Sequence, residues 1–224
     1  HELPGDNVWN IKPRSREQRI ALQLLTDPAI QVVTLVGQAG SGKTLLALAA
    51  ALQQVLRDAV FENILVSRPI IPLGKDIGYL PGDKNEKLSV WMQPIYDNLD
   101  YLLHTEKRGE SVKRKVDELI RTGKLELEAL TYIRGRSIPH QFVIIDEAQN
   151  LTPHEVKTIV SRAGEDTKMV LTGDPEQIDN PYLDASSNGL SYIVERFKDL
   201  PLHGHITLRK SERSELAAAA AEYL

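Results

Sequence analysis

With 224 residues, the chain is long enough to bury a full hydrophobic core in one large domain or two small ones. It contains no cysteine, which excludes disulfides and thiolate metal sites, and no apolar run of membrane-spanning length, so we expect a cytoplasmic protein without a membrane partner. The net charge of −4 provides no global attraction for nucleic acid, so any such site must be a local basic patch.

The first residues, 1–16, are expected to form an irregular segment or linker, because they are rich in turn-forming proline, glycine and asparagine. Since the chain starts with His1 rather than methionine, we expect an upstream domain to be missing. Ser15 is placed to cap a helix that ends near Asp27. Gln18 in that helix can read an adenine edge with one donor and one acceptor, although an ordinary exposed glutamine fits the position equally well.

A phosphate-binding loop is predicted directly after the first buried strand. The pattern Gly-x-x-x-x-Gly-Lys-Thr occupies residues 37–44, between an apolar β-branched run at residues 31–36 and a stretch of strong helix formers. Glycine allows backbone N–H groups to converge on phosphate oxygens, and the first helical turn adds its free N–H groups and positive dipole end. Lys43 would contact the β- and γ-phosphates, and Thr44 would offer its hydroxyl to Mg²⁺. The expected nucleotide ligands are Gly37, Gln38, Ala39, Gly40, Ser41, Gly42, Lys43, Thr44 and Leu45, together with Gln18.

The next buried strand is predicted at residues 63–67, and it leads into a loop with three prolines and three glycines at residues 68–82. In open α/β sheets, functional loops leave the carboxyl ends of the strands. Arg68 and Lys75 can therefore contact a nucleic-acid backbone, and a pair of solvated cations is the alternative.

A helical and basic insertion is expected at about residues 83–124. Residues 86–104 have helical spacing, with Pro94 as a kink or as the start of a second helix, and a short amphipathic helix ends at Gly123. The lysines and arginines between positions 107 and 115 form a small basic cluster, which either contacts RNA or DNA or is a solvated face.

Residues 125–130 alternate strictly between apolar and polar side chains, which predicts a further strand. Arg134 and Arg136 follow it on either side of a glycine, and they are candidates for phosphate binding. Pairing with acidic neighbours to hold a loop is an equally good interpretation of these arginines.

Two carboxylates stand at the end of the apolar run at residues 142–145. A Mg²⁺-nucleotide needs a carboxylate opposite the loop hydroxyl, and Asp146 fits that role. Glu147 is then placed to act as general base on the attacking water. Considered alone, Asp146 and Glu147 would be interpreted as an acidic turn at the end of a strand. The phosphate-binding loop elsewhere in the chain favours a catalytic role for them instead.

The alternation of helices and strands continues in the last third of the chain. Thr152 is expected to begin a helix with a capping box, and residues 169–173 are predicted to form a strand before a polar turn. Gln177 in that turn can hydrogen-bond both the γ-phosphate and the attacking water, which would make it the reporter of nucleotide state.

A helix at residues 188–200 and a strand at residues 205–208 are the last predicted elements before an alanine-rich end. Arg213 and, as second choice, Arg209 follow that strand and are candidates for an arginine finger on the transferring phosphoryl group. Together the elements predict an α/β fold, a mostly parallel sheet with helices on both faces, in a single domain over residues 17–224.

The combined motifs resemble a known family. The segments that look like the first three catalytic motifs of superfamily 1 helicases are residues 37–44, 143–150 and 171–177. The segments that look like the PhoH-type ATPases, in particular the form with an N-terminal PIN ribonuclease domain, are residues 67–69, 78–82, 132–136 and 208–214. The resemblance implies a RecA-like P-loop NTPase core with ATP and Mg²⁺, and assembly into a ring, expected to be a hexamer. It also implies RNA unwinding or translocation coupled to ATP hydrolysis.

Superfamily 1 helicases place two such domains in one chain, whereas this chain has room for one. The arginine finger must then come from a neighbouring subunit of the ring, or the chain is inactive alone. Two other functions fit the same loop, an ATP-dependent switch that regulates a partner or fused ribonuclease, and a small-molecule kinase. The adjacent carboxylates of Asp146 and Glu147 favour water as the acceptor of the phosphoryl group, which argues against the kinase.

Overall fold

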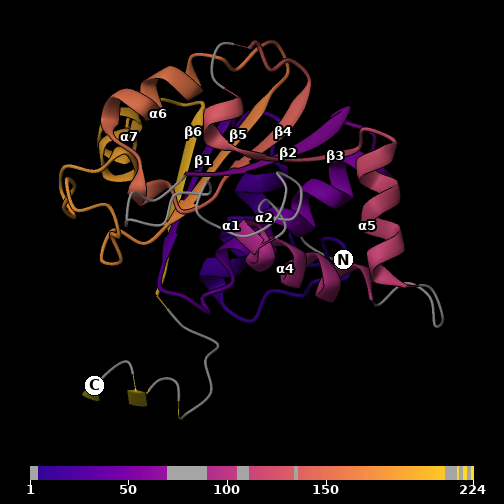
Figure 1. Cartoon of the computed structure of the whole chain (residues 1–224), viewed down its shortest axis with the longest axis horizontal. Helices are drawn as coiled ribbons and strands as arrows, with labels where there is room; N and C mark the ends of the chain where they lie inside the picture. The colour runs from indigo at the N-terminus through magenta and orange to yellow at the C-terminus, as the bar shows by residue number, and fades with distance from the viewer. Residues whose placement is uncertain are drawn as a thin grey trace.

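The computed structural model describes residues 5–69, 90–104, 111–133 and 136–209, together with positions 216, 219, 220, 223 and 224. In this part of the chain a six-stranded parallel sheet is covered by helices on both faces (Figure 1), so the predicted fold class is confirmed. The strands are β1 (Val32–Gly37), β2 (Asn63–Arg68), β3 (Leu125–Ala129), β4 (Gln141–Ile145), β5 (Lys168–Gly173) and β6 (His203–Leu208). The α-helices are α1 (Arg16–Thr26), α2 (Lys43–Leu52), α4 (Gln93–Leu103), α5 (Val112–Arg121), α6 (Pro153–Val160) and α7 (Gly189–Phe197). Short helical turns lie at Gln53–Arg57, Leu130–Tyr132 and Ala148–Asn150.

Every pairing between these strands is parallel, and their order is β3-β2-β4-β5-β1-β6. The register places Ser67 beside Ile145, Ile145 beside Leu171, and Gly37 beside Leu208. The carboxyl ends of β1, β2, β4, β5 and β6 therefore lie at one edge of the sheet. Ligands of open α/β folds bind at this edge, and the strand-end motifs of the sequence meet there.

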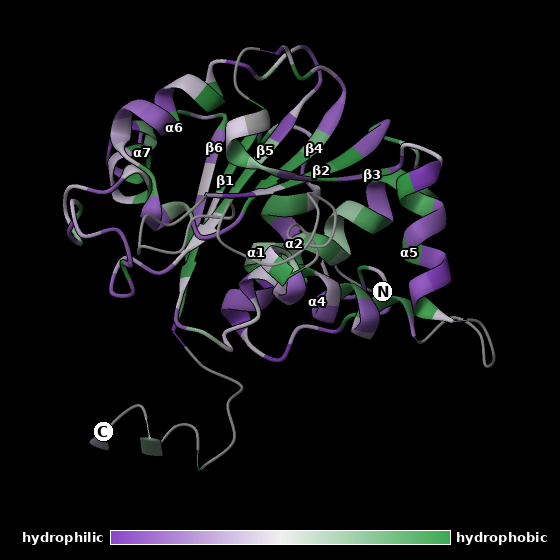
Figure 2. Ribbon diagram, in the orientation of Figure 1, coloured by the Kyte–Doolittle hydropathy of each residue, from purple (hydrophilic) through white to green (hydrophobic). Residues whose placement is uncertain are grey.

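Two apolar layers hold the helices on the sheet. On one face α1, α2, α4 and α5 pack around a core that includes Leu22, Leu48 and Leu99. On the other face α6 and α7 pack over residues such as Val143 and Leu171. Figure 2 shows apolar strands in the middle of the molecule and helices that are more polar on their outer sides. Strands that are apolar on both faces are expected in a parallel sheet covered on both sides.

The helices begin with the caps that the sequence predicts. Ser15 Oγ accepts a hydrogen bond from the Gln18 N–H at 3.1 Å, at the start of α1. Thr152 and Glu155 form a complete capping box at the start of α6. Pro94 lies in the first turn of α4, so of the two possibilities it starts a helix and does not kink one.

Residues 5–15 contain no long helix or strand, and they pack against the rest of the described chain. Trp9 is buried, and its Nε1 donates a hydrogen bond to the Leu102 carbonyl of α4 at 3.1 Å. The helices α4 and α5, which were expected to form an insertion, contribute Ile95 and Val116 to the same core. Both segments therefore contribute to the same hydrophobic core.

A buried lysine fixes the carboxyl end of α1 to the sheet. Lys168 begins β5, and its Nζ donates to the carbonyls of Leu24 and Asp27 at 2.7 and 2.8 Å. Burial lowers the pKa of Lys168 to about 8. The carbonyls at a helix end carry partial negative charge, so they are suitable partners for this ammonium group. The contact helps to hold the helix that carries Gln18.

Candidate functional site

The phosphate-binding loop has the backbone geometry that only its glycines allow without strain. Gly42, directly before α2, has a φ of 92°, in the left-handed region that other residues rarely adopt. A Cβ on Gly37 would lie 2.5 Å from the Ser41 Oγ, so a side chain there would disrupt the loop. Lys43 is largely buried, and its Nζ donates to the Gln38 carbonyl at 3.3 Å. The loop, the amino end of α2 and an ammonium group thus lie together, which suits an anionic ligand.

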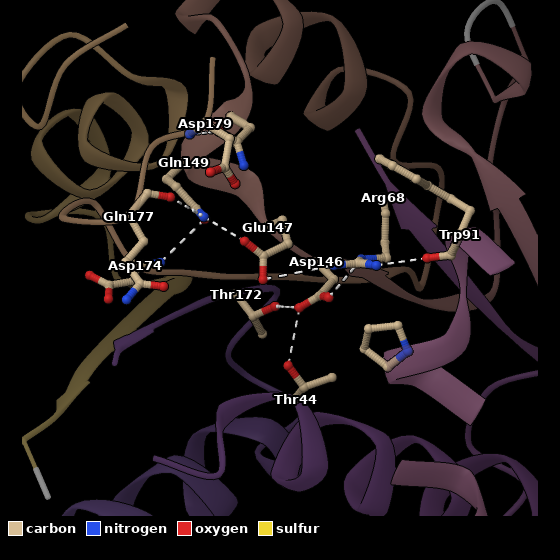
Figure 3. A network of polar contacts seen from close by, with 12 residues as sticks. Thr44, Arg68, Trp91, Asp146, Glu147, Gln149, Thr172, Asp174, Gln177 and Asp179 are labelled. Atoms are coloured by element: carbon tan, nitrogen blue, oxygen red, sulfur yellow. Dashed lines mark hydrogen bonds and ion pairs between the residues drawn. The ribbon is translucent and has the colours of Figure 1, made fainter. Parts of the chain in front are cut away.

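Asp146 lies opposite this loop and is held by two hydroxyl groups (Figure 3). Thr44 Oγ1 donates to Asp146 Oδ1 at 3.1 Å, and Thr172 Oγ1 donates to the same oxygen at 2.7 Å. Asp146 follows β4, and Thr172 lies near the end of the neighbouring strand β5. The structure therefore brings together Thr44 and Asp146, the two residues that the sequence proposes for a metal ion, and it adds Thr172.

Arg68 supplies a positive charge to this cluster. Its Nε lies 3.1 Å from Asp146 Oδ2, and its Nη2 lies 3.9 Å from Glu147 Oε1. Its Nη1 donates to the Trp91 carbonyl at 2.7 Å, and its guanidinium carbon lies 5.5 Å from the centre of the Trp91 ring. The structure therefore places the Arg68 guanidinium beside the two carboxylates, and its contact with nucleic acid stays a prediction. The side chain turns toward the acidic pair because β2 and β4 are neighbours in the sheet.

Gln149 connects Glu147 to the turn after β5. Glu147 has a φ of 57°, in the left-handed region. The fully buried Gln149 donates through its Nε2 to Glu147 Oε2 at 2.5 Å and to the Gln177 carbonyl at 3.1 Å. Its Oε1 accepts from the Asp174 N–H at 3.2 Å, and a Cβ on Gly173 would overlap this oxygen. Gln149 thus links the candidate base to the candidate sensor turn. Gln149 was not among the residues predicted from the sequence, although its place just after Asp146 and Glu147 was a usable signal.

Of the remaining catalytic candidates, the structure describes Gln177 and Arg209. The Gln177 side chain is exposed, and its backbone carbonyl is the atom that joins the network. Arg209 is exposed and directly follows Leu208, the partner of Gly37 in the sheet, so it lies beside the start of the loop. The candidates that lie outside the described residues are Arg213, Lys75 and Arg134.

Arg136 belongs to an ion pair and is not a free cation. Its Nη1 and Nη2 each lie 2.9 Å from one carboxylate oxygen of Glu126 on β3. Hydrogen bonding to Glu126 raises the pKa of the Arg136 guanidinium above its usual value. Of the two interpretations of this arginine, the structure favours the one in which it holds a loop. Its contact with nucleic acid stays a prediction.

A cavity of about 770 Å³ adjoins the loop, within the size range of small-molecule sites. Gln18 lines this cavity and is 7% exposed, so it is not an ordinary surface glutamine. Its Oε1 accepts from the Arg14 N–H at 2.8 Å, and its Nε2 donates to the Ser41 carbonyl at 3.2 Å. Gln18 therefore ties the loop to the segment before α1. The lining residues contributed by α4 are Asp97, Asn98 and Tyr101.

Comparisons with known sequences cover nearly the whole chain. The family described as PhoH-like protein matches residues 10–223. The chain is 56% identical over 220 residues to protein PhoH2 of Bacillus subtilis, covering 98% of this chain and 49% of that protein. It is 43% identical over 222 residues to protein PhoH2 of Thermobispora bispora, again covering 98% of this chain and 49% of that protein. The chain thus spans about half the length of these curated relatives.

Solved structures show more distant likenesses. The Sulfolobus solfataricus SWI2/SNF2 ATPase core in complex with dsDNA gives a TM-score of 0.49 at 14% identity, covering 92% of this chain and 46% of that one. Pif1 helicase from Candida albicans gives a TM-score of 0.43 at 16% identity, covering 95% of this chain and 43% of that one. At such values the fold assignment depends on the chain's own parallel sheet and phosphate-binding loop, which are those of a RecA-like P-loop NTPase.

Proposed function

The chain belongs to the PhoH-like protein family, and on this premise we propose that it hydrolyses ATP with Mg²⁺ and couples hydrolysis to RNA unwinding or translocation. The observation that supports this proposal best is the continuous polar network at the carboxyl edge of the sheet. It runs from Thr44 to Asp146 and, through the ion pairs of Arg68, to Glu147. From Glu147 it continues through Gln149 to the turn that contains Gln177. This arrangement joins a phosphate-binding loop, a candidate base and a candidate sensor.

Each residue of the network has a place in the proposed hydrolysis. The loop N–H groups and Lys43 would hold the phosphates and offset the charge that develops on them. Glu147 would accept a proton from the attacking water, and the hydrogen bond from Gln149 directs its carboxylate. Gln177 would contact the γ-phosphate, and its backbone contact with Gln149 would pass the state of that phosphate to Glu147.

The donor set near the loop suits Mg²⁺. The Thr44 hydroxyl and the Asp146 carboxylate are hard oxygen donors of the kind that this ion prefers. Among the described residues, no three histidine, cysteine, aspartate or glutamate side chains converge into a complete metal site. Phosphate oxygens and water would therefore supply the other ligands, and the bound ion would neutralise charge on the β- and γ-phosphates.

Replacing Gln149 tests whether it directs Glu147. Gln149→Leu is expected to lower kcat by about 10- to 100-fold with ATP affinity nearly unchanged, because a hydrogen bond to a charged group contributes about 1.5–3 kcal/mol. Steady-state hydrolysis and a separate ATP-binding titration measure the two effects. Gln141→Leu, at the end of β4 that lies away from Asp146 and the network, is the matched control and is expected to keep its activity. An unchanged kcat in Gln149→Leu would show that Glu147 is oriented by other contacts.

RNA binding, ring assembly and an additional domain are the finer parts of the proposal. The motif resemblance supports RNA as the substrate and a hexameric ring in which Arg213 of one subunit reaches the nucleotide of the next. Arg209, beside the loop of its own chain, is better placed for a contact in cis. The motif resemblance also supports an N-terminal PIN domain, and the curated relatives are long enough to contain an additional domain, since this chain covers 49% of their length. The helices in the described ranges include none suited to span a lipid bilayer. A cytoplasmic location is a separate part of the proposal.

One observation favours a second candidate function, the ATP-dependent regulation of a partner or fused ribonuclease. Arg68 and Arg136, two of the predicted nucleic-acid contacts, are engaged with Asp146 and Glu126 instead. The described residues thus offer fewer free cations for RNA than the sequence predicted. A regulatory switch needs the site of ATP hydrolysis but does not need a surface that binds RNA.

ATP turnover by the full-length protein, with and without single-stranded RNA, tests the proposed function. We expect hydrolysis without any other acceptor, faster hydrolysis with RNA, and strand displacement on a tailed duplex. Hydrolysis that leaves the duplex intact would support the regulatory switch. The absence of turnover even with RNA would contradict the proposal and favour the small-molecule kinase.

A further inference from the structure

We propose that Arg68 is a positioning residue that competes with Mg²⁺ for Asp146 and so couples the metal site to the start of α4. This inference rests on the proposed function, because it requires Mg²⁺ to bind with the nucleotide beside Thr44 and Asp146. In this proposal Arg68 acts in the site of ATP hydrolysis, whereas the sequence predicted a contact with nucleic acid.

Arg68 compensates the negative charge of the acidic pair. Among the described residues, the ion pairs of Asp146 and Glu147 both involve this arginine, at 3.1 and 3.9 Å. The side chain of Asp146 is 4% exposed and that of Arg68 is 14% exposed. A buried carboxylate without a counter-ion is costly, so Arg68 stabilises the pair when no metal ion is bound.

The two oxygens of Asp146 have different partners (Figure 3). Oδ1 accepts hydrogen bonds from both Thr44 and Thr172, whereas Oδ2 faces Arg68. A divalent cation between Thr44 and Asp146 would therefore lie close to the guanidinium group. Like charges in a partly buried site repel each other strongly. Either Arg68 moves away when the metal binds, or the metal binds more weakly than it would without Arg68.

The same guanidinium group reaches the residues that precede α4. Its Nη1 donates to the Trp91 carbonyl at 2.7 Å, and the group lies near the face of the Trp91 ring. The helix α4 begins two residues later and carries Tyr101, which lines the cavity beside the phosphate-binding loop. A movement of Arg68 away from Asp146 would thus act on the turn that leads into one wall of this cavity.

The Mg²⁺ dependence of nucleotide binding tests the competition. A fluorescent, non-hydrolysable ATP analogue is titrated into the full chain at a series of Mg²⁺ concentrations. Arg68→Gln is expected to lower the half-saturating Mg²⁺ concentration about tenfold, because a charge at this distance changes cation binding to a carboxylate by roughly that factor or more. Arg68→Lys keeps the charge and is expected to stay within about twofold of the wild type. Binding of the analogue without Mg²⁺ is expected to be unchanged in both variants, since Lys43 and the loop are intact.

Two further variants make this test decisive. Arg136→Gln removes a comparable arginine–carboxylate pair on β3 and is expected to keep the wild-type Mg²⁺ requirement. Arg68→Met is a second neutral variant if Arg68→Gln does not fold, with the same expected direction. An unchanged or higher Mg²⁺ requirement in a folded neutral variant would overturn the role of Arg68 and leave the proposed function intact. Failure of the wild type to bind the analogue would instead overturn the proposed function itself.

The proposed coupling between the metal site and the start of α4 is measured separately, by the fluorescence of Trp91. The chain has two tryptophans, so in a Trp9→Phe background the fluorescence comes from Trp91. Adding Mg²⁺ to the analogue-bound protein is expected to change the Trp91 emission when Arg68 is present, and to leave it unchanged in Arg68→Gln. An equal change with and without Arg68 would show that Arg68 does not carry the coupling.

Discussion

Glu147→Gln is expected to keep ATP bound while turnover falls by about 10²–10⁴-fold, the usual contribution of a general base. The amide has nearly the same size as the carboxylate and can still accept the hydrogen bond from Gln149, but it cannot take a proton from water. The phosphate contacts come from the loop and Lys43, so the affinity for ATP should change little. Single-turnover hydrolysis and an equilibrium binding titration measure the two quantities separately.

The control for Glu147→Gln is a second glutamate-to-glutamine substitution at a residue away from the phosphate-binding loop and Asp146. Glu165→Gln alters an exposed residue in the turn before β5 and is expected to hydrolyse ATP at the wild-type rate. Wild-type turnover by Glu147→Gln would mean that another group activates the water, and the assignment of the base would be wrong. A large loss of ATP affinity would instead identify Glu147 as a ligand of the bound nucleotide.

The strands of the sheet could be predicted because each carries its own signal. The apolar runs at residues 31–36 and 142–145 have the length and β-branched composition of strands buried on both faces. Their order in the sheet could not be predicted in the same way. Parallel strands are joined by crossovers, so neighbours in the sheet need not be neighbours in the chain. Thus β4 lies between β2 and β5 although β3 precedes it in sequence.

This strand order explains which site residues the sequence identified and which it did not. Lys43, Thr44 and Asp146 belong to local motifs whose spacing defines their chemistry, so they could be assigned without knowledge of the sheet. Arg68 and Thr172 meet Asp146 only because β2 and β5 flank β4 in a parallel register. In the sequence, Arg68 simply opens a proline-rich loop, and Thr172 is a threonine at the end of an apolar run. Their role depends on tertiary neighbours.

The second large effect is expected from Lys43→Ala, which should abolish measurable ATP hydrolysis. Removing one preorganised charged or hydrogen-bonding group that stabilises a transition state costs about 10²–10³-fold in kcat, and this lysine would also contact the bound phosphates. Both kcat and ATP affinity should therefore fall. In the structure its ammonium donates to the Gln38 carbonyl of the loop, so truncation should leave the fold intact. Hydrolysis, ATP binding and thermal unfolding are measured on the same preparation.

The comparison with Glu147→Gln separates two functions within one network. Lys43→Ala is expected to weaken nucleotide binding, whereas Glu147→Gln is expected to block the later proton transfer with the nucleotide in place. Lys157→Ala, an exposed lysine on α6, is the control for the loss of a lysine and should behave as the wild type. If Lys43→Ala hydrolysed ATP normally, the loop would not be the phosphate site. Because Thr44 directly follows Lys43 and bonds Asp146, that result would also remove the reason for placing the metal ion there.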